Sequence, residues 1–72
     1  MTRYEWRIKL RTEIDDYWQL TSKVPKAIYM GYCEWYDYRT NIPPSQYNPN
    51  GELTFDGIEI INVRKDSYFR II

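Results

Sequence analysis

The stretch ELTFDGIEII, residues 52–61, carries the clearest local structural signal in the chain. Leu53 and Phe55 precede an Asp-Gly pair, and Ile58 and Ile60 come after it with the same alternate spacing. An Asp-Gly pair between alternating apolar residues is typical of a two-residue type I′ turn, because both turn positions need a positive φ. We therefore predict a β-hairpin in which Phe55 pairs near Ile58 and Leu53 near Ile60.

The two ends of the chain also show strand patterns. In residues 3–11, apolar side chains share one parity and charged side chains share the other. A period of two predicts a strand with one solvated face. Thr12 and the acidic residues after it predict a short helix over residues 12–21, because both favour a helix N-terminus. Residues 68–72 predict a last short strand.

The middle of the chain combines an aromatic segment with a proline-rich one. Residues 27–38 are rich in Tyr and Trp and predict a long strand that is apolar on both faces. Such a strand is central in the sheet, is bulged at Gly31, or exposes one face to a partner. Residues 41–51 contain Pro43, Pro44 and Pro49 and predict a long loop.

Together these elements predict a single α+β domain over residues 1–72. We expect a small curled antiparallel sheet of four to five strands with one short helix, in the order β-α-β-β-β-β. A small barrel of SH3-like or OB-like type is the alternative. A chain of 72 residues is too short to build a second core.

Composition limits the function classes. The chain has ten basic and ten acidic residues, so its net charge is zero, which argues against nucleic-acid binding by bulk charge. It has no histidine and a single cysteine, Cys33, so an internal disulfide, a cysteine-based zinc site and His-dependent catalysis are not expected. We predict a non-enzymatic protein without cofactor or metal. No apolar run approaches the roughly 20 residues of a membrane span, and no leader is recognised, which predicts a cytoplasmic protein.

Aromatic residues make up 18% of the chain, and Tyr and Trp are common in protein interfaces. On a strand, alternate side chains face opposite ways, so some aromatics of residues 29–38 are expected to be exposed. We predict an aromatic–acidic surface that docks a larger protein or nucleoprotein complex through a basic partner surface. Its residues are Tyr32, Glu34, Trp35, Tyr36, Asp37 and Tyr38, with Tyr47 from the proline-rich loop.

Two other interpretations use the uneven charge distribution, which is basic at both ends and acidic in the middle. If the first and last strands are neighbours, a basic stripe beside aromatics predicts single-stranded nucleic-acid binding. Separate basic and acidic zones are also compatible with a homodimer, with edge strands pairing across it. The stripe comprises Arg3, Arg7, Lys9, Arg11, Arg64, Lys65 and Arg70.

In its small size, aromatic richness and lack of catalytic residues, the chain is similar to small accessory proteins of phages and other mobile elements. Many such proteins inhibit host or defence machinery by occupying a surface, anti-CRISPR proteins among them. The resemblance implies an inhibitor of a host or defence complex, and it implies no role for any particular residue.

Overall fold

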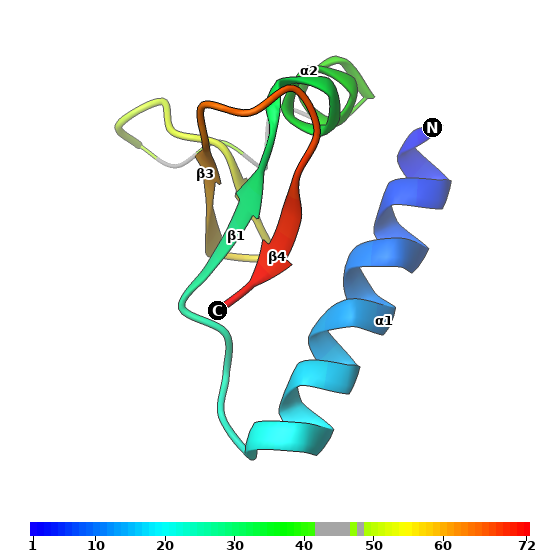
Figure 1. Ribbon diagram of the computed structural model, residues 1–72, viewed down its shortest axis with the longest axis vertical. Coiled ribbons are helices and arrows are strands. Elements are labelled where there is room, and N and C mark those ends of the chain that lie inside the picture. The colour runs from blue at the N-terminus through cyan, green and yellow to red at the C-terminus, as the bar shows by residue number, and fades with distance from the viewer. Residues whose placement is uncertain (42–46, 48) are drawn as a thin grey trace.

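A computed structural model describes residues 1–41, 47 and 49–72 of the chain. Within these residues, two helices and four strands follow in the order α1 (Arg3–Thr21), β1 (Ala27–Met30), α2 (Tyr32–Asn41), β2 (Thr54–Phe55), β3 (Ile58–Asn62) and β4 (Phe69–Ile71) (Figure 1). The α+β class is confirmed. The order is α-β-α-β-β-β, however, so the predicted single helix and β-α-β-β-β-β order are wrong. Most of the predicted loop over residues 41–51, with Pro43 and Pro44, lies outside the described residues.

The four strands form one mixed sheet in the order β2-β3-β1-β4. β1 runs parallel to β3, whereas the β1–β4 and β2–β3 pairs are antiparallel. Parallel neighbours need a crossover connection, and α2 lies in the segment that connects β1 with the hairpin. The expectation of a curled, all-antiparallel sheet or a small barrel is wrong, because the sheet is open and mixed.

The hairpin prediction is confirmed. Phe55 pairs with Ile58, and the amide of Ile60 donates to the carbonyl of Leu53 at 3.0 Å. Asp56 and Gly57 have φ values of 49° and 84°, the two positive angles that a type I′ turn requires.

The predicted strand over residues 3–11 is instead the first half of α1. Thr2 is the N-cap of this helix: its hydroxyl accepts from the Glu5 amide while the Glu5 carboxylate accepts from the Thr2 amide. This reciprocal pair is a capping box. Trp6 and Leu10, four residues apart, are both buried, which is the spacing of one helical face. Residues 12–21 are helical as predicted, but they continue a helix that began earlier, and the chain leaves it at Ser22 in a left-handed conformation.

The predicted strand over residues 27–38 ends at Met30, and residues 32–41 form α2. A Cβ atom at Gly31 would lie 2.6 Å from the Tyr68 amide nitrogen, so the chain approaches itself there too closely for any other residue. The amides of Tyr32 and Cys33 donate to the Lys65 and Asp66 carbonyls at 2.8 and 2.9 Å. The loop between β3 and β4 thus satisfies amides at the N-terminus of α2.

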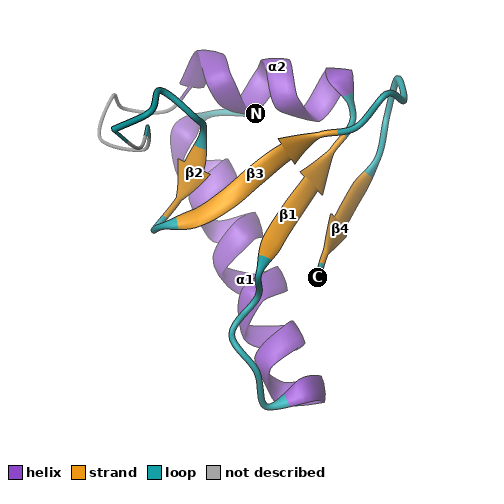
Figure 2. Cartoon of the chain, turned by 90° about the vertical axis from the view of Figure 1, so that its left-hand side faces the viewer, coloured by secondary structure: helices purple, strands orange, loops and turns teal. Residues whose placement is uncertain are grey.

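The core lies between α1, α2 and one face of the sheet. Figure 2 shows α1 behind the sheet and α2 across its upper end, with the front face of the sheet free of helices. The fully buried Ile28, Met30 and Tyr38 meet Trp6 and Leu10 in this core. The rings of Trp6 and Tyr38 pack edge to face, with centroids 5.6 Å apart.

Candidate functional site

The predicted aromatic–acidic residues of the 32–38 segment lie on α2 rather than on a strand. The helix buries some of their side chains and leaves others exposed. Tyr38 is fully buried, and its hydroxyl donates to the Thr54 carbonyl at 2.7 Å. Burial raises the pKa of the Tyr38 phenol, so it stays protonated and keeps this hydrogen bond. Trp35 is half-buried and packs against the core, whereas Tyr32 and Tyr36 are exposed. Tyr38 is therefore not available to a partner.

The two carboxylates of this set hold other parts of the chain. Asp37 Oδ2 accepts from the Met1 amino group and from the Trp6 indole, each at 2.8 Å. The hydrogen bond from the amino group, together with that from Trp6, keeps the pKa of the Asp37 carboxyl below its ordinary value despite partial burial. Asp37 thus connects the start of α1 to α2.

Glu34 joins α2 to the β3–β4 loop in the same way. Its carboxylate accepts from the Tyr68 amide at 2.8 Å and from the Ser67 hydroxyl. Partial burial acts to raise the pKa of the Glu34 carboxyl, but hydrogen bonds from Ser67 and Tyr68 outweigh it, and the pKa lies below its ordinary value. Glu34 and Asp37 therefore each connect α2 to another part of the fold.

Two of the predicted residues do meet, in a hollow of about 440 Å³ between α2 and the β2–β3 hairpin. Trp35 lines it from α2, and Tyr47, which bridges to Leu53, lines it from the other side. Arg39 lies with its guanidinium carbon 5.2 Å from the centre of the Trp35 ring and 5.9 Å from that of Tyr36. We call this region the α2 hollow. Its lining comprises Trp35, Arg39, Tyr47, Gly51, Glu52, Leu53, Glu59 and Ile60.

The predicted basic stripe is divided between two sides of the molecule. Its first four members, at positions 3, 7, 9 and 11, lie on α1, which packs on the covered face of the sheet. Arg11 pairs with Asp56 at 2.7 Å, and Lys9 Nζ lies 4.7 Å from the centre of the Phe69 ring. The other three, at positions 64, 65 and 70, lie on the β3–β4 loop and on β4. The prediction of one stripe from neighbouring first and last strands is wrong, because the first segment is a helix.

Sequence reasoning missed a set of exposed apolar residues on and after α1. Tyr4 and Ile8 lie one turn apart, and Trp18, Leu20 and Val24 lie at the other end, where the last turns of α1 project beyond the sheet (Figure 1). The four-residue spacing of Tyr4 and Ile8 is the signal that a helical interpretation would have used.

The described residues contain no group of three or more His, Cys, Asp or Glu side chains placed to hold a metal ion. Cys33 is a free and exposed thiol at the start of α2. Within residues 1–41, 47 and 49–72, no helix has the length and apolar character needed to cross a membrane.

Comparison with protein-family models, curated proteins and solved structures finds no match to this chain. Geometry and surface chemistry are therefore the basis for a functional assignment.

Proposed function

We propose that this protein is a non-enzymatic protein-binding module and that the α2 hollow is its contact site. The observation that carries the proposal is the grouping of Trp35, Arg39 and Tyr47 around one hollow, with the exposed ring of Tyr36 against Arg39. Trp, Tyr and Arg are the residue types enriched in the energetically dominant parts of protein interfaces. A volume of about 440 Å³ is large enough to receive a side chain of a partner.

The chemistry of the hollow favours a basic partner. Its walls include the rings of Trp35 and Tyr47, and the acidic residues Glu52 and Glu59 belong to the same lining. A Lys or Arg side chain places an apolar stem against aromatic rings and its charge near carboxylates. An inhibitor that acts by occupying a basic surface of a larger complex would use a site of this kind.

Affinity purification of the tagged chain from its native host, with and without nuclease, tests the proposal by identifying a partner. Tyr36→Ala and Arg39→Ala should weaken binding to that partner by at least about tenfold, because each removes an exposed interface side chain without removing a core contact. Isothermal calorimetry with the purified partner measures the change, and circular dichroism verifies that the variants remain folded.

Tyr4→Ala is the matched control, because Tyr4 is an exposed aromatic on α1 and does not line the hollow. Unchanged binding by this variant supports the proposal. Loss of binding by Tyr4→Ala with full binding by Tyr36→Ala and Arg39→Ala would move the interface to α1 and overturn the assignment.

A further inference from the structure

The face of the sheet opposite α1 carries a second set of aromatic and basic side chains. Tyr29 of β1 pairs with Arg70 of β4 and, on its other side, with Ile61 of β3. The Gly31 amide donates to the Tyr68 carbonyl at 2.8 Å, which continues the same ladder by one step. Side chains two apart on a strand share a face, so Tyr68 and Arg70 lie on the same face of the sheet as Tyr29. Arg70 is the direct cross-strand neighbour of Tyr29, and Tyr68 is its diagonal neighbour. We call Tyr29, Ile61, Tyr68 and Arg70 the helix-free face.

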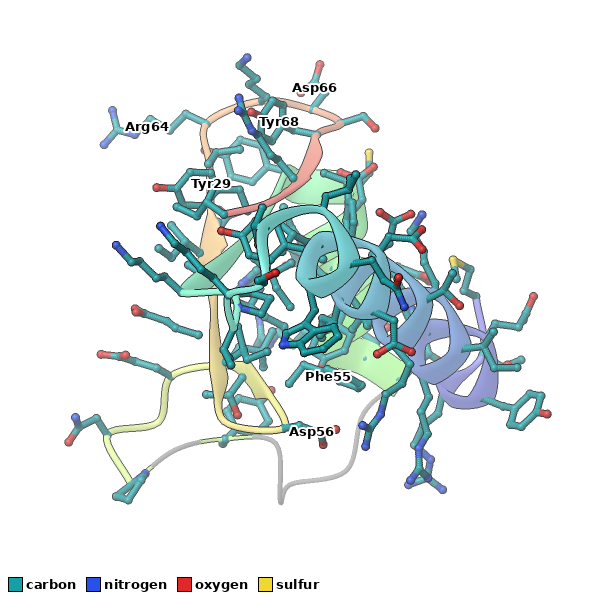
Figure 3. The ribbon with its side chains drawn as sticks, turned by 90° about the horizontal axis from the view of Figure 1, so that it is seen from below. Tyr29, Phe55, Asp56, Arg64, Asp66 and Tyr68 are labelled. Carbon is teal, nitrogen blue, oxygen red and sulfur yellow. The ribbon has the colours of Figure 1, made fainter. Side chains whose placement is uncertain are left out.

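Cations border this face along the β3–β4 loop and β4. Lys65 Nζ lies 4.6 Å from the centre of the Tyr68 ring, and Arg64 comes just before it in the β3–β4 loop. Seen from below, Tyr29, Tyr68 and Arg64 all lie on the side of the sheet away from α1 (Figure 3). Among the described residues, no carboxylate forms an ion pair with Arg64 or Arg70. Both residues are exposed, so their guanidinium groups can bind an anion.

We propose that the helix-free face binds single-stranded nucleic acid. Tyr29 and Tyr68 stack bases, and Arg64, Lys65 and Arg70 contact phosphates. Open sheet faces with adjacent aromatic rings are suited to unpaired bases, because every base presents a flat ring for stacking. In a duplex the base faces are already stacked on one another, so they are not accessible to these tyrosines.

Charge complementarity places the nucleic acid along β4 and the β3–β4 loop. Glu59 lies on the same face but on β3, on the other side of β1 from β4, where it pairs with Ala27. Its carboxylate repels phosphates on that side, whereas Arg70 on β4 and Arg64 and Lys65 in the β3–β4 loop attract them. The zero net charge of the chain is compatible with this site, because Arg3, Arg7 and most of the acidic residues lie elsewhere. The tyrosines and cations of this site do not line the α2 hollow, so this inference is independent of the proposed function.

Fluorescence anisotropy with a labelled oligouridine of roughly ten nucleotides tests the proposal at low salt. Binding should weaken as salt rises, with a log–log slope of about −2, the value expected for three phosphate contacts on a single strand. A duplex of equal length should bind at least about fivefold more weakly. A labelled oligoglutamate serves as the competing acidic polymer. No oligouridine binding at low salt, or equal binding of oligouridine and oligoglutamate, would overturn the proposal.

Two variants and a matched control locate the site. Arg70→Glu and Tyr29→Leu should each weaken oligouridine binding by about tenfold or more. Arg7→Glu changes the charge by the same amount on α1, and it should leave binding within about twofold. Equal weakening by Arg7→Glu would show binding by general charge and would overturn the assignment. If circular dichroism shows that Tyr29→Leu lowers the melting temperature, the result for Arg70→Glu decides, because Arg70 is exposed. Tyr36→Ala should leave oligouridine binding unchanged, so each proposal can fail without the other.

Discussion

The two faces of the sheet differ in what their side chains do, and β1 shows this within four residues. Ile28 and Met30 point toward α1 and are fully buried, whereas Tyr29 between them points away and is only half-buried. On the covered face, Ile28 and Met30 pack with the helices in the core. On the helix-free face, tyrosines lie beside cations. One short strand therefore holds the core with alternate residues and presents a surface with the others.

The same difference shows how the small domain is held together. The helices contribute Trp6, Leu10 and Tyr38 to the covered face only. Burial of apolar area is the main source of stability, so substitutions on the covered face should cost much more than those on the other.

Met30→Ala set against Tyr29→Ala tests this asymmetry with the largest expected effect. Met30→Ala should lower the free energy of unfolding by about 2–5 kcal/mol, because it opens a cavity in the core. Tyr29→Ala should lower it by about 1 kcal/mol or less, because the ring is partly solvated. Urea unfolding followed by tryptophan fluorescence measures both. Equal losses for the two variants would contradict the asymmetry.

Gly31→Ala tests the point where the β3–β4 loop meets the end of β1. The added Cβ would lie 2.6 Å from the Tyr68 nitrogen and 2.8 Å from the Lys65 oxygen, which are backbone atoms and cannot simply rotate away. We expect a loss of about 1–3 kcal/mol in the free energy of unfolding and large NMR shift changes at Tyr68. Gly51→Ala is a comparison without a clash, since nothing lies within 4 Å of its added Cβ, although its φ of 81° adds strain. Unchanged amide shifts across residues 64–68 in Gly31→Ala would refute the close approach.

Tyr38→Phe tests a polar contact on the covered side. It removes the donor to the Thr54 carbonyl, which accepts the Tyr38 hydrogen bond within the core. The free energy of unfolding should fall by about 1–3 kcal/mol. Tyr36→Phe is the control, because its ring is exposed, and thermal melting should show no change. A Tyr38→Phe protein as stable as the parent would mean that this hydrogen bond contributes nothing to the fold.

Acid should weaken the contacts of Glu34 with Ser67 and Tyr68 in the β3–β4 loop, and the loss of stability should be smaller than in the variants above. The folded pKa values of Glu34 and Asp37 lie below their ordinary values of 4.5 and 3.8. Their contribution to the free energy of unfolding is therefore complete when the pH is above the ordinary pKa values, and it is lost as the pH falls through the lower pKa values of the folded protein. Each carboxylate is partly solvated, so we expect less than about 1 kcal/mol from either. Glu34→Gln should reduce the acid-dependent part of the change in chemical denaturation between pH 6 and about pH 3. An unchanged pH dependence in this variant would argue against the Glu34 contacts.

The parts of the fold that are predictable depend on neighbours in sequence. The hairpin is predictable with its register, because Asp56 and Gly57 supply the turn angles and the flanking residues alternate. The α1 segment is ambiguous, because its apolar residues at positions 4, 6, 8 and 10 satisfy a period of two while those at 6, 10 and 14 also satisfy a helical face. The capping box at Thr2 and Glu5 is the local signal that decides between them.

The candidate site is predictable in part. Composition and pattern indicate Trp35, Tyr36 and Tyr47, which do lie at or beside the α2 hollow. They do not indicate Arg39, because its position over two rings exists only once α2 is helical. They also indicate the basic residues of the last segment, but the assignment of these residues to one stripe with those of α1 depends on a strand that does not form.

Local sequence is enough to specify the α+β class, the hairpin and the last strand, because turn angles and alternation act over a few residues. Long-range contacts determine where β1 ends and that a helix follows it. The carbonyls of Lys65 and Asp66, more than thirty residues away, accept from the first amides of α2, and the β3–β4 backbone leaves no room for a side chain at Gly31. Such contacts depend on the whole fold, so no local pattern encodes them. The face of the sheet that stays free is set in the same way, by where α1 packs.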